Sequence, residues 1–142
     1  MKKSLYEVLE ECSKGKNVEE RVALLQKNGT APIQTILQYA FDPRIKFLLP
    51  DTDPPYKPTD FLDQENRLYS ELRRLYLFIE GGNPNLTKLK RENLFIQLLE
   101  SIDKNDAVLL CHVKNKTLPF KELTAKVVRK AFPELLPEEI KQ

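Results

Sequence analysis

The fold of this chain is decided by an almost wholly apolar run, AVLLCHV at residues 107–113, and by the segments that follow it. A basic connector, KNKTLPFK, occupies residues 114–121, and the amphipathic segment ELTAKVVRKAF occupies residues 122–132. Seven apolar or weakly polar residues in a row are typical of a buried element, and the alternation that follows has the period of a helix. The stretch therefore predicts a buried helix, a basic loop and a second helix with one basic side.

Cations are concentrated in this stretch, and between residues 114 and 130 the only anion is Glu122. The six cations are Lys114, Lys116, Lys121, Lys126, Arg129 and Lys130. At about 100° per residue, the last three fall opposite the apolar side of their helix. A solvated helix face is the usual explanation of such a pattern. The cations of the preceding loop favour another one, in which loop and helix together contact a phosphate chain.

Length and charge bound what this chain can do. Its 142 residues are enough for one domain with a real core, and its net charge is only +2. Any affinity for nucleic acid must therefore come from local clusters of cations. Cys12 and Cys111 lie in apolar helical patterns far apart in the sequence, so we interpret them as reduced core residues of an intracellular protein. No signal-peptide core and no apolar run of bilayer length occurs, which predicts a soluble, cytoplasmic protein without membrane contact.

Apolar periodicity and cap residues predict helices along the rest of the chain. We expect helices that begin near Ser4, Asn17 and Pro32, one that runs from about Phe61 to Ile79 with Leu68, Leu72, Leu75, Tyr76 and Ile79 inward, and one that begins near Asn85 or Thr87. Residues 44–50 are partly alternating and predict an extended piece with room for a two-strand pairing, and residues 51–60 form a Pro-rich loop. The prediction is an all-α single domain over residues 1–142, with about six to seven helices and a tail at 138–142.

The sequence shows no motif that would support catalysis. Neither the Gly-x-x-x-x-Gly-Lys phosphate loop nor the Gly-x-Ser-x-Gly nucleophile motif occurs. The single histidine, His112, lies in an apolar run and is interpreted as a core or turn residue, while Asp103 and Asp106 flank a helix start that they can cap. We therefore expect no enzyme activity, no metal, no cofactor and no small-molecule substrate.

Three stretches together resemble the all-helical N-terminal DNA-binding domain of ATP-dependent DNA ligases, especially those of bacteriophages. They are ILQYAFDPRIKF at residues 36–47, GGNPNLTKLK at residues 81–90, and the helix, loop, helix and aromatic-Pro ending of residues 106–137. The resemblance covers most of the chain in the family's order. It implies a ligase-domain-like helical fold that holds duplex or nicked DNA through its phosphates, with little base readout.

The resemblance also implies which residues contact DNA. They are Thr87, Lys88 and Lys90 of the first loop and helix start, and Lys116, Lys121, Thr124 and Lys126 of the second loop and helix, beside the basic cluster named above. Lys88 and Lys90 crowd the start of a helix, where the helix dipole favours anions, so a bound phosphate would remove the conflict. With about four to six phosphate contacts, the logarithm of the association constant for DNA should fall with the logarithm of the salt concentration at a slope of roughly −4 to −5.

This chain departs from the ligase pattern at two places. Pro119 and Phe120 stand where the family usually carries a pair of small residues that approach the DNA closely. The Lys-x-Asp-Gly motif of the ligase catalytic domain is absent, because no aspartate precedes any of the four glycines. We therefore expect a DNA-binding module without the enzyme.

The sequence leaves three functions open. The first is a non-catalytic DNA-binding protein of a bacterium or a phage-infected host that serves replication, repair or transcription. The second is an interaction adaptor on a ligase-like scaffold, without DNA binding, which docks a replication or transcription protein through the Pro-rich loop 51–60 or the tail. The third is a ligase part supplied in trans. The first and second depend on whether the two basic segments share one face of the fold.

Overall fold

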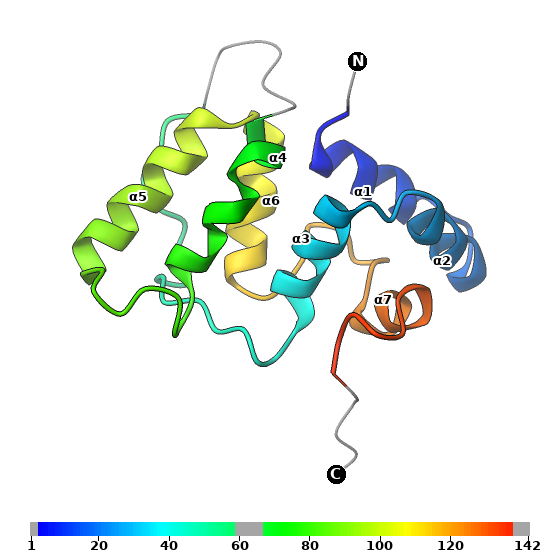
Figure 1. Cartoon of the computed structure of the whole chain (residues 1–142). Helices are drawn as coiled ribbons and strands as arrows, with labels where there is room; N and C mark the ends of the chain where they lie inside the picture. The colour runs from blue at the N-terminus through cyan, green and yellow to red at the C-terminus, as the bar shows by residue number, and fades with distance from the viewer. Residues whose placement is uncertain (1–2, 59–66, 138–142) are drawn as a thin grey trace.

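The computed structural model of this chain describes residues 3–58 and 67–137, in which every regular element is a helix (Figure 1). The elements are α1 (Leu5–Ser13), α2 (Val18–Lys27), α3 (Ala31–Phe41), α4 (Arg67–Glu71), the 3₁₀-helix η1 (Leu72–Phe78), α5 (Lys88–Ser101), α6 (Lys104–Lys114) and α7 (Ala125–Ala131). The prediction of an all-α single domain with about six to seven helices is confirmed. The predicted tail and parts of the predicted loop and long helix fall at residues 138–142 and 59–66, outside the described residues.

The apolar run at residues 107–113 forms the central helix, α6, which packs against α1, α3 and α5. Its Ala107 and Leu109 are fully buried, and Cys111 is nearly so. Cys111 and Cys12 are both free thiols in the core, as the sequence predicted, and burial raises the pKa of each. Because α6 contacts partners on several sides, the other helices are arranged around it: α5 and η1 on one flank, α1, α2 and α7 on the other (Figure 1).

The predicted helix starts are confirmed by their cap hydrogen bonds. The Ser4 hydroxyl accepts from the Glu7 amide at 3.1 Å, and the Asn17 side chain accepts from the Glu20 amide at 2.9 Å. Asp103 caps α6 by accepting from the Asn105 amide. Each cap satisfies an amide that has no partner within its helix, which is why polar residues at these positions were informative.

Asp106 differs from its predicted role as a second cap of α6. Its buried carboxylate lies in the first turn of α6 but accepts from the amide of Tyr6 in α1, at 2.9 Å. The residue therefore supports the start of a helix 100 positions earlier in the chain. Sequence spacing alone cannot reveal such a contact, because it exists only once α1 and α6 are packed together.

The prediction of one α-helix up to Ile79 is wrong within the described residues. The chain is α-helical only at Arg67–Glu71 and continues as a 3₁₀-helix over Leu72–Phe78. The physical reason is the three-residue spacing of the buried Leu72, Leu75 and Phe78, which aligns on one face only when a turn contains three residues. Tyr76, which an α-helical stripe would have buried, is instead 47% exposed.

The extended piece predicted near residues 44–50 pairs with the chain that leaves η1. Phe47 and Ile79 form an isolated antiparallel bridge, flanked by hydrogen bonds from the Leu48 amide to the Phe78 carbonyl and from the Glu80 amide to the Lys46 carbonyl, both 2.8 Å long. The pairing is too short to be a strand. It fixes the start of the Pro-rich loop against the fold.

We expect Gly82→Ala to destabilise the protein more than Gly81→Ala. A Cβ at Gly82 would lie 1.7 Å from the carbonyl oxygen of Tyr76, so the backbone must move, at a cost of about 3 kcal/mol or more. A Cβ at Gly81 meets open space, and only its φ of +83° opposes alanine, by about 1–2 kcal/mol. Urea unfolding of both variants checks this, and equal losses would contradict it.

Candidate nucleic-acid interface

The start of α5 and helix α7, which carry exposed cations of the two predicted basic segments, lie on opposite flanks of the fold. Figure 1 shows α5 at one side and α7 at the other, with α3 and α6 between them. Lys114, at the end of α6, does line a pocket together with Leu89. The prediction that helical packing brings the two segments side by side is therefore wrong for the cations of α7. The start of α5 and the whole of α7 do share the lower margin of the molecule in this view.

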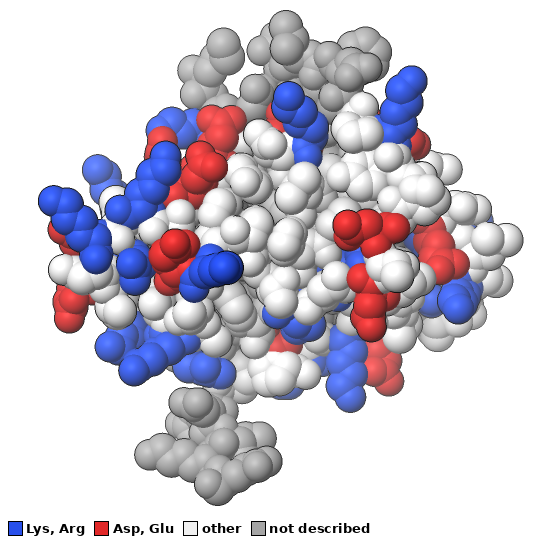
Figure 2. All heavy atoms as spheres, turned by 180° about the vertical axis from the view of Figure 1, so that it is seen from behind, with Lys and Arg blue, Asp and Glu red and all other residues white. Residues whose placement is uncertain are grey.

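The cations around α7 are exposed to solvent. Lys121, Lys126 and Lys130 are exposed, Arg129 is half-buried, and none forms an ion pair with a carboxylate among the described residues. Figure 2 shows cationic side chains gathered at the lower left corner, which is the corner of α7 when the molecule is seen from behind. We call Lys121, Lys126, Arg129 and Lys130 the α7 cluster.

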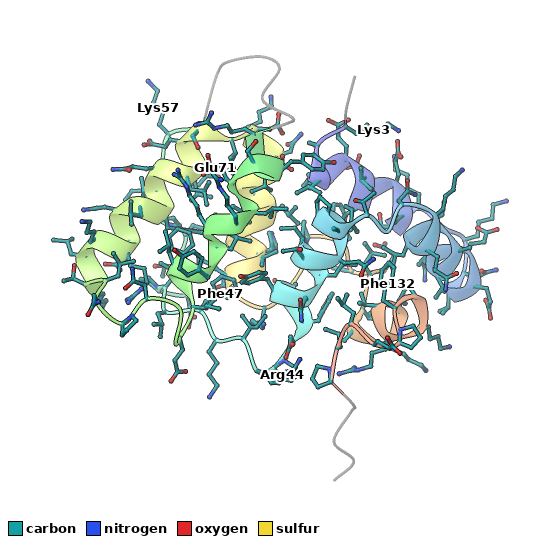
Figure 3. The ribbon with its side chains drawn as sticks, viewed as in Figure 1. Lys3, Arg44, Phe47, Lys57, Glu71 and Phe132 are labelled. Carbon is teal, nitrogen blue, oxygen red and sulfur yellow. The ribbon has the colours of Figure 1, made fainter. Side chains whose placement is uncertain are left out.

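Helix α7 is held firmly by α2, which makes its cations a fixed array. Val127 and Val128 are buried in the contact, and the Thr124 hydroxyl caps the helix by accepting from the Val127 amide at 3.3 Å. Phe132, labelled in Figure 3, closes the packing: a Cβ at Gly29 would lie 2.6 Å from its ring. Thr124, predicted as a DNA contact, therefore has a structural role at this helix start.

The predicted contacts at the start of α5 are exposed as well. Lys88 and Lys90 flank Leu89, whose side chain is 70% exposed, and no described carboxylate pairs with either lysine. The Thr87 hydroxyl caps α5 by accepting from the Lys90 amide at 3.2 Å. These residues remain candidates, but as a group separated from the α7 cluster.

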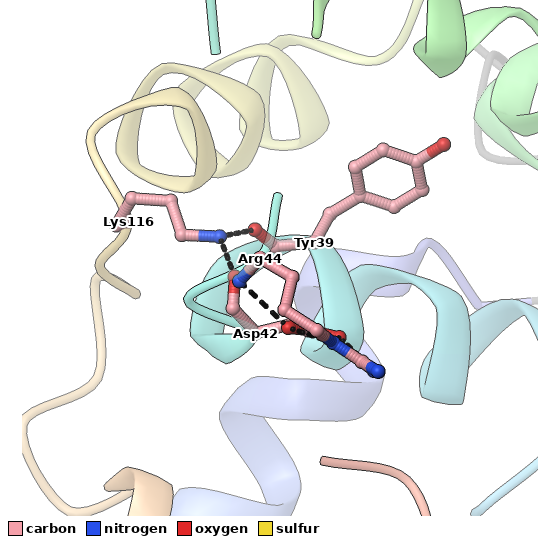
Figure 4. Close-up of polar contacts among 4 residues, drawn as sticks. All are labelled: Tyr39, Asp42, Arg44 and Lys116. Atoms are coloured by element: carbon pink, nitrogen blue, oxygen red, sulfur yellow. Dashed lines mark hydrogen bonds and ion pairs between the residues drawn. The ribbon is translucent and has the colours of Figure 1, made fainter. Parts of the chain in front are cut away.

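Lys116 corrects the predicted set, because its ammonium is bound within the protein (Figure 4). It donates to the carbonyl oxygens of Tyr39 and Asp42, at the end of α3, at 2.6 and 2.8 Å. The ammonium also lies 5.9 Å from the centre of the Phe47 ring. Partial burial lowers the pKa of Lys116, and the nearby Asp42 opposes that shift.

The backbone of Lys116 explains how its side chain reaches α3. The Thr117 amide bonds to the His112 carbonyl and the Lys116 amide to the Val113 carbonyl, the two bonds of a Schellman motif. Lys116 stands at the position where glycine is usual, with φ of +62°. His112, interpreted from sequence as a core or turn residue, is half-buried in this turn.

Lys114, also predicted as a DNA contact, is bound within the protein as well. Its side chain is 5% exposed, and its ammonium donates to the carbonyls of Pro50 and Asp51 at 2.9 and 3.2 Å and to the Asn115 amide oxygen at 3.1 Å. A buried ammonium needs such acceptors, because it has lost its water. Lys114 therefore fastens the Pro-rich loop to α6 and has no donor facing solvent.

Asp42 and Arg44 form an ion pair that the sequence analysis did not predict. The Asp42 carboxylate is 1% exposed and accepts from the Arg44 amide at 2.9 Å and from its guanidinium at 2.8 Å. These hydrogen bonds lower the pKa of the Asp42 carboxyl. The Asp-Pro-Arg order was a possible signal, since aspartate often bonds to the backbone two residues on. Figure 3 places Arg44 at the lower margin, below α3.

Comparison with known proteins gives one result. The family described as "Family of unknown function (DUF6433)" matches residues 8–119. The chain belongs to this family. The match includes Lys88, Lys90, Lys114 and Lys116 of the DUF6433 protein, while the α7 cluster lies beyond it. No curated protein and no solved structure matches the chain.

Over residues 3–58 and 67–137, no group of three or more histidine, cysteine, aspartate or glutamate side chains could hold a metal ion. In the same described part of the chain, no helix has both the length and the apolar character needed to cross a membrane.

We expect Lys116→Met to lower the free energy of unfolding more than Lys116→Gly does. Both variants lose the ammonium that bonds the end of α3, at a cost of about 1.5–3 kcal/mol. Glycine recovers about 1–2 kcal/mol of that loss, because it adopts the positive φ without strain. Urea unfolding measures the order, and a methionine variant as stable as the glycine variant would contradict it.

Asp42→Asn is expected to lower stability at pH 7 by about 1–2 kcal/mol and to flatten its acid dependence. Because the pKa of Asp42 is lower in the folded than in the unfolded protein, its contribution is present above the unfolded pKa of about 4 and is lost as pH falls further. Unfolding curves from pH 7 to pH 3 should therefore converge for wild type and variant. A constant difference over that range would show that Asp42 acts without its charge.

Proposed function

We propose that this protein is a non-catalytic DNA-binding protein that contacts duplex or nicked DNA through phosphates, with little sequence preference, in the cytoplasm of a bacterium or a phage-infected host. The observation that carries the proposal is the α7 cluster: four cations around one firmly packed short helix, without a carboxylate partner among the described residues. Cations left without partners on a rigid surface suit a chain of phosphates.

Fewer cations are available to contact DNA than the sequence alone predicted. Lys114 and Lys116 are bound to backbone carbonyls, so the α7 cluster supplies the main contact and Lys88 and Lys90 a separate, minor one. Both lie toward the lower margin of the view in Figure 1, on opposite flanks. With about four phosphate contacts, log K should fall with log salt at a slope of roughly −4.

Charge reversal on α7 tests the proposal. We expect wild type to shift nicked and intact duplex at low salt, and the variant Lys121→Glu, Lys126→Glu, Lys130→Glu to bind at least about tenfold more weakly with a slope near −1. The matched control is Lys14→Glu, Lys16→Glu, Lys27→Glu, which makes the same change in net charge on exposed lysines around α1 and α2. Fluorescence anisotropy over a salt series measures both quantities.

Two results would contradict the proposal. If both triple variants lose affinity equally, binding reflects net charge and not a site at α7. If wild type gives no shift with any duplex at low salt, the protein does not bind DNA, and the interaction adaptor becomes the better explanation. The separation of the two basic segments on opposite flanks favours that alternative.

A further inference from the structure

The extended piece around Phe47 has one paired edge and one open edge. On the paired edge, the Lys46 carbonyl and the Leu48 amide bond to the chain at residues 78–80. In an extended chain, the amide and carbonyl of each residue point to the edge opposite those of its neighbours. The backbone groups of Phe47 therefore point away from residues 78–80.

The open edge has no hydrogen-bond partner in the described part of the chain. Neither the amide nor the carbonyl of Phe47 is bonded there, and the carbonyl of Ile45, on the same edge, has no partner either. Groups of this kind pair with water or with the backbone of another chain, which then adds to the edge as a further strand. Pro43 and Pro50 bound the edge, so it has room for a short ladder only.

A groove of about 510 Å³ gives access to the open edge. Ile45 and Phe47 line it, together with the end of α3 and the turn at residues 114–116, while residues 78–80 lie outside its described lining. Figure 4 shows one wall, where Lys116 reaches the end of α3. The volume is within the range of ligand sites in proteins, roughly 300–1,000 Å³.

Cations predominate around this groove. Lys46, Lys114 and Lys116 line it, against one carboxylate, that of Asp51. Lys46 is exposed, and no described carboxylate forms an ion pair with any of the three lysines. The ammonium groups of Lys114 and Lys116 are bonded to neutral oxygens, which occupy their donors without cancelling their charge. The groove therefore attracts negative charge.

We propose that this open edge binds an extended acidic segment of a partner protein. The segment adds as a short strand: the Phe47 amide donates to one of its carbonyls, and the carbonyls of Ile45 and Phe47 accept from its amides. Its carboxylates meet the exposed ammonium of Lys46 and the positive charge of the groove. The proposal does not depend on DNA binding at the α7 cluster.

A peptide suits this edge better than a nucleic acid does. The phosphates of a duplex accept hydrogen bonds but do not donate them, so they would leave the carbonyls of Ile45 and Phe47 unpaired. A peptide backbone supplies donors and acceptors together, at the spacing of the edge.

Three labelled peptides test the proposal with the full chain. The first alternates threonine and glutamate. The second and third have the same sequence with every other amide N-methylated, at the threonines in one and at the glutamates in the other. We expect the first to give saturable anisotropy changes and one methylated peptide to bind at least about tenfold more weakly, because only one edge of an added strand faces the protein. The other methylated peptide should bind like the first.

Hydrogen exchange and two variants locate the binding. The Leu48 amide is bonded to the Phe78 carbonyl, so it should be protected with and without the peptide. The Phe47 amide should become protected only when the peptide is bound. Lys46→Glu should raise the dissociation constant about fivefold to tenfold. Lys104→Glu makes the same change in charge at an exposed lysine in the first turn of α6 and should leave it unchanged.

Three results would overturn the proposal: no saturable binding up to about 1 mM, equal binding of all three peptides, or a Phe47 amide whose exchange the peptide does not slow. Displacement of the peptide by a duplex oligonucleotide, if it still occurs when Lys121, Lys126 and Lys130 are changed to glutamate, would assign the groove to nucleic acid instead.

Discussion

The burial of α6 is the constraint on which the rest of this structure depends. A helix surrounded by neighbours must satisfy its polar side chains inside the protein, and α6 carries one such group near each end. Asp106 accepts the Tyr6 amide at the start of α1, and Lys114 binds the carbonyls of the Pro-rich loop. Because an unpaired buried charge is costly, these contacts fix α1 and the loop relative to the core.

Cations in this chain divide into two functional groups that composition cannot separate. The ammonium of Lys116 binds carbonyl oxygens at the end of α3, and that of Lys114 binds carbonyl oxygens of the Pro-rich loop. The lysines of the α7 cluster point to solvent and have no such acceptors among the described residues. A basic loop thus stabilises the turn between α6 and α7, and the basic character that remains available to a ligand begins at Lys121. The modest net charge of the whole chain is compatible with this division.

Sequence alone determined the helical class, most helix starts and the buried nature of residues 107–113, because caps and apolar periodicity are local properties of the chain. It also predicted the exposed cations of α7, but it grouped the bound Lys114 and Lys116 with them. It did not determine the 3₁₀ path of Leu72–Phe78, the bonds of Lys114, Lys116 and Asp106, or the position of α5 relative to α7. Those features depend on which distant carbonyls, amides and apolar side chains meet once the helices pack, so only the tertiary structure decided them.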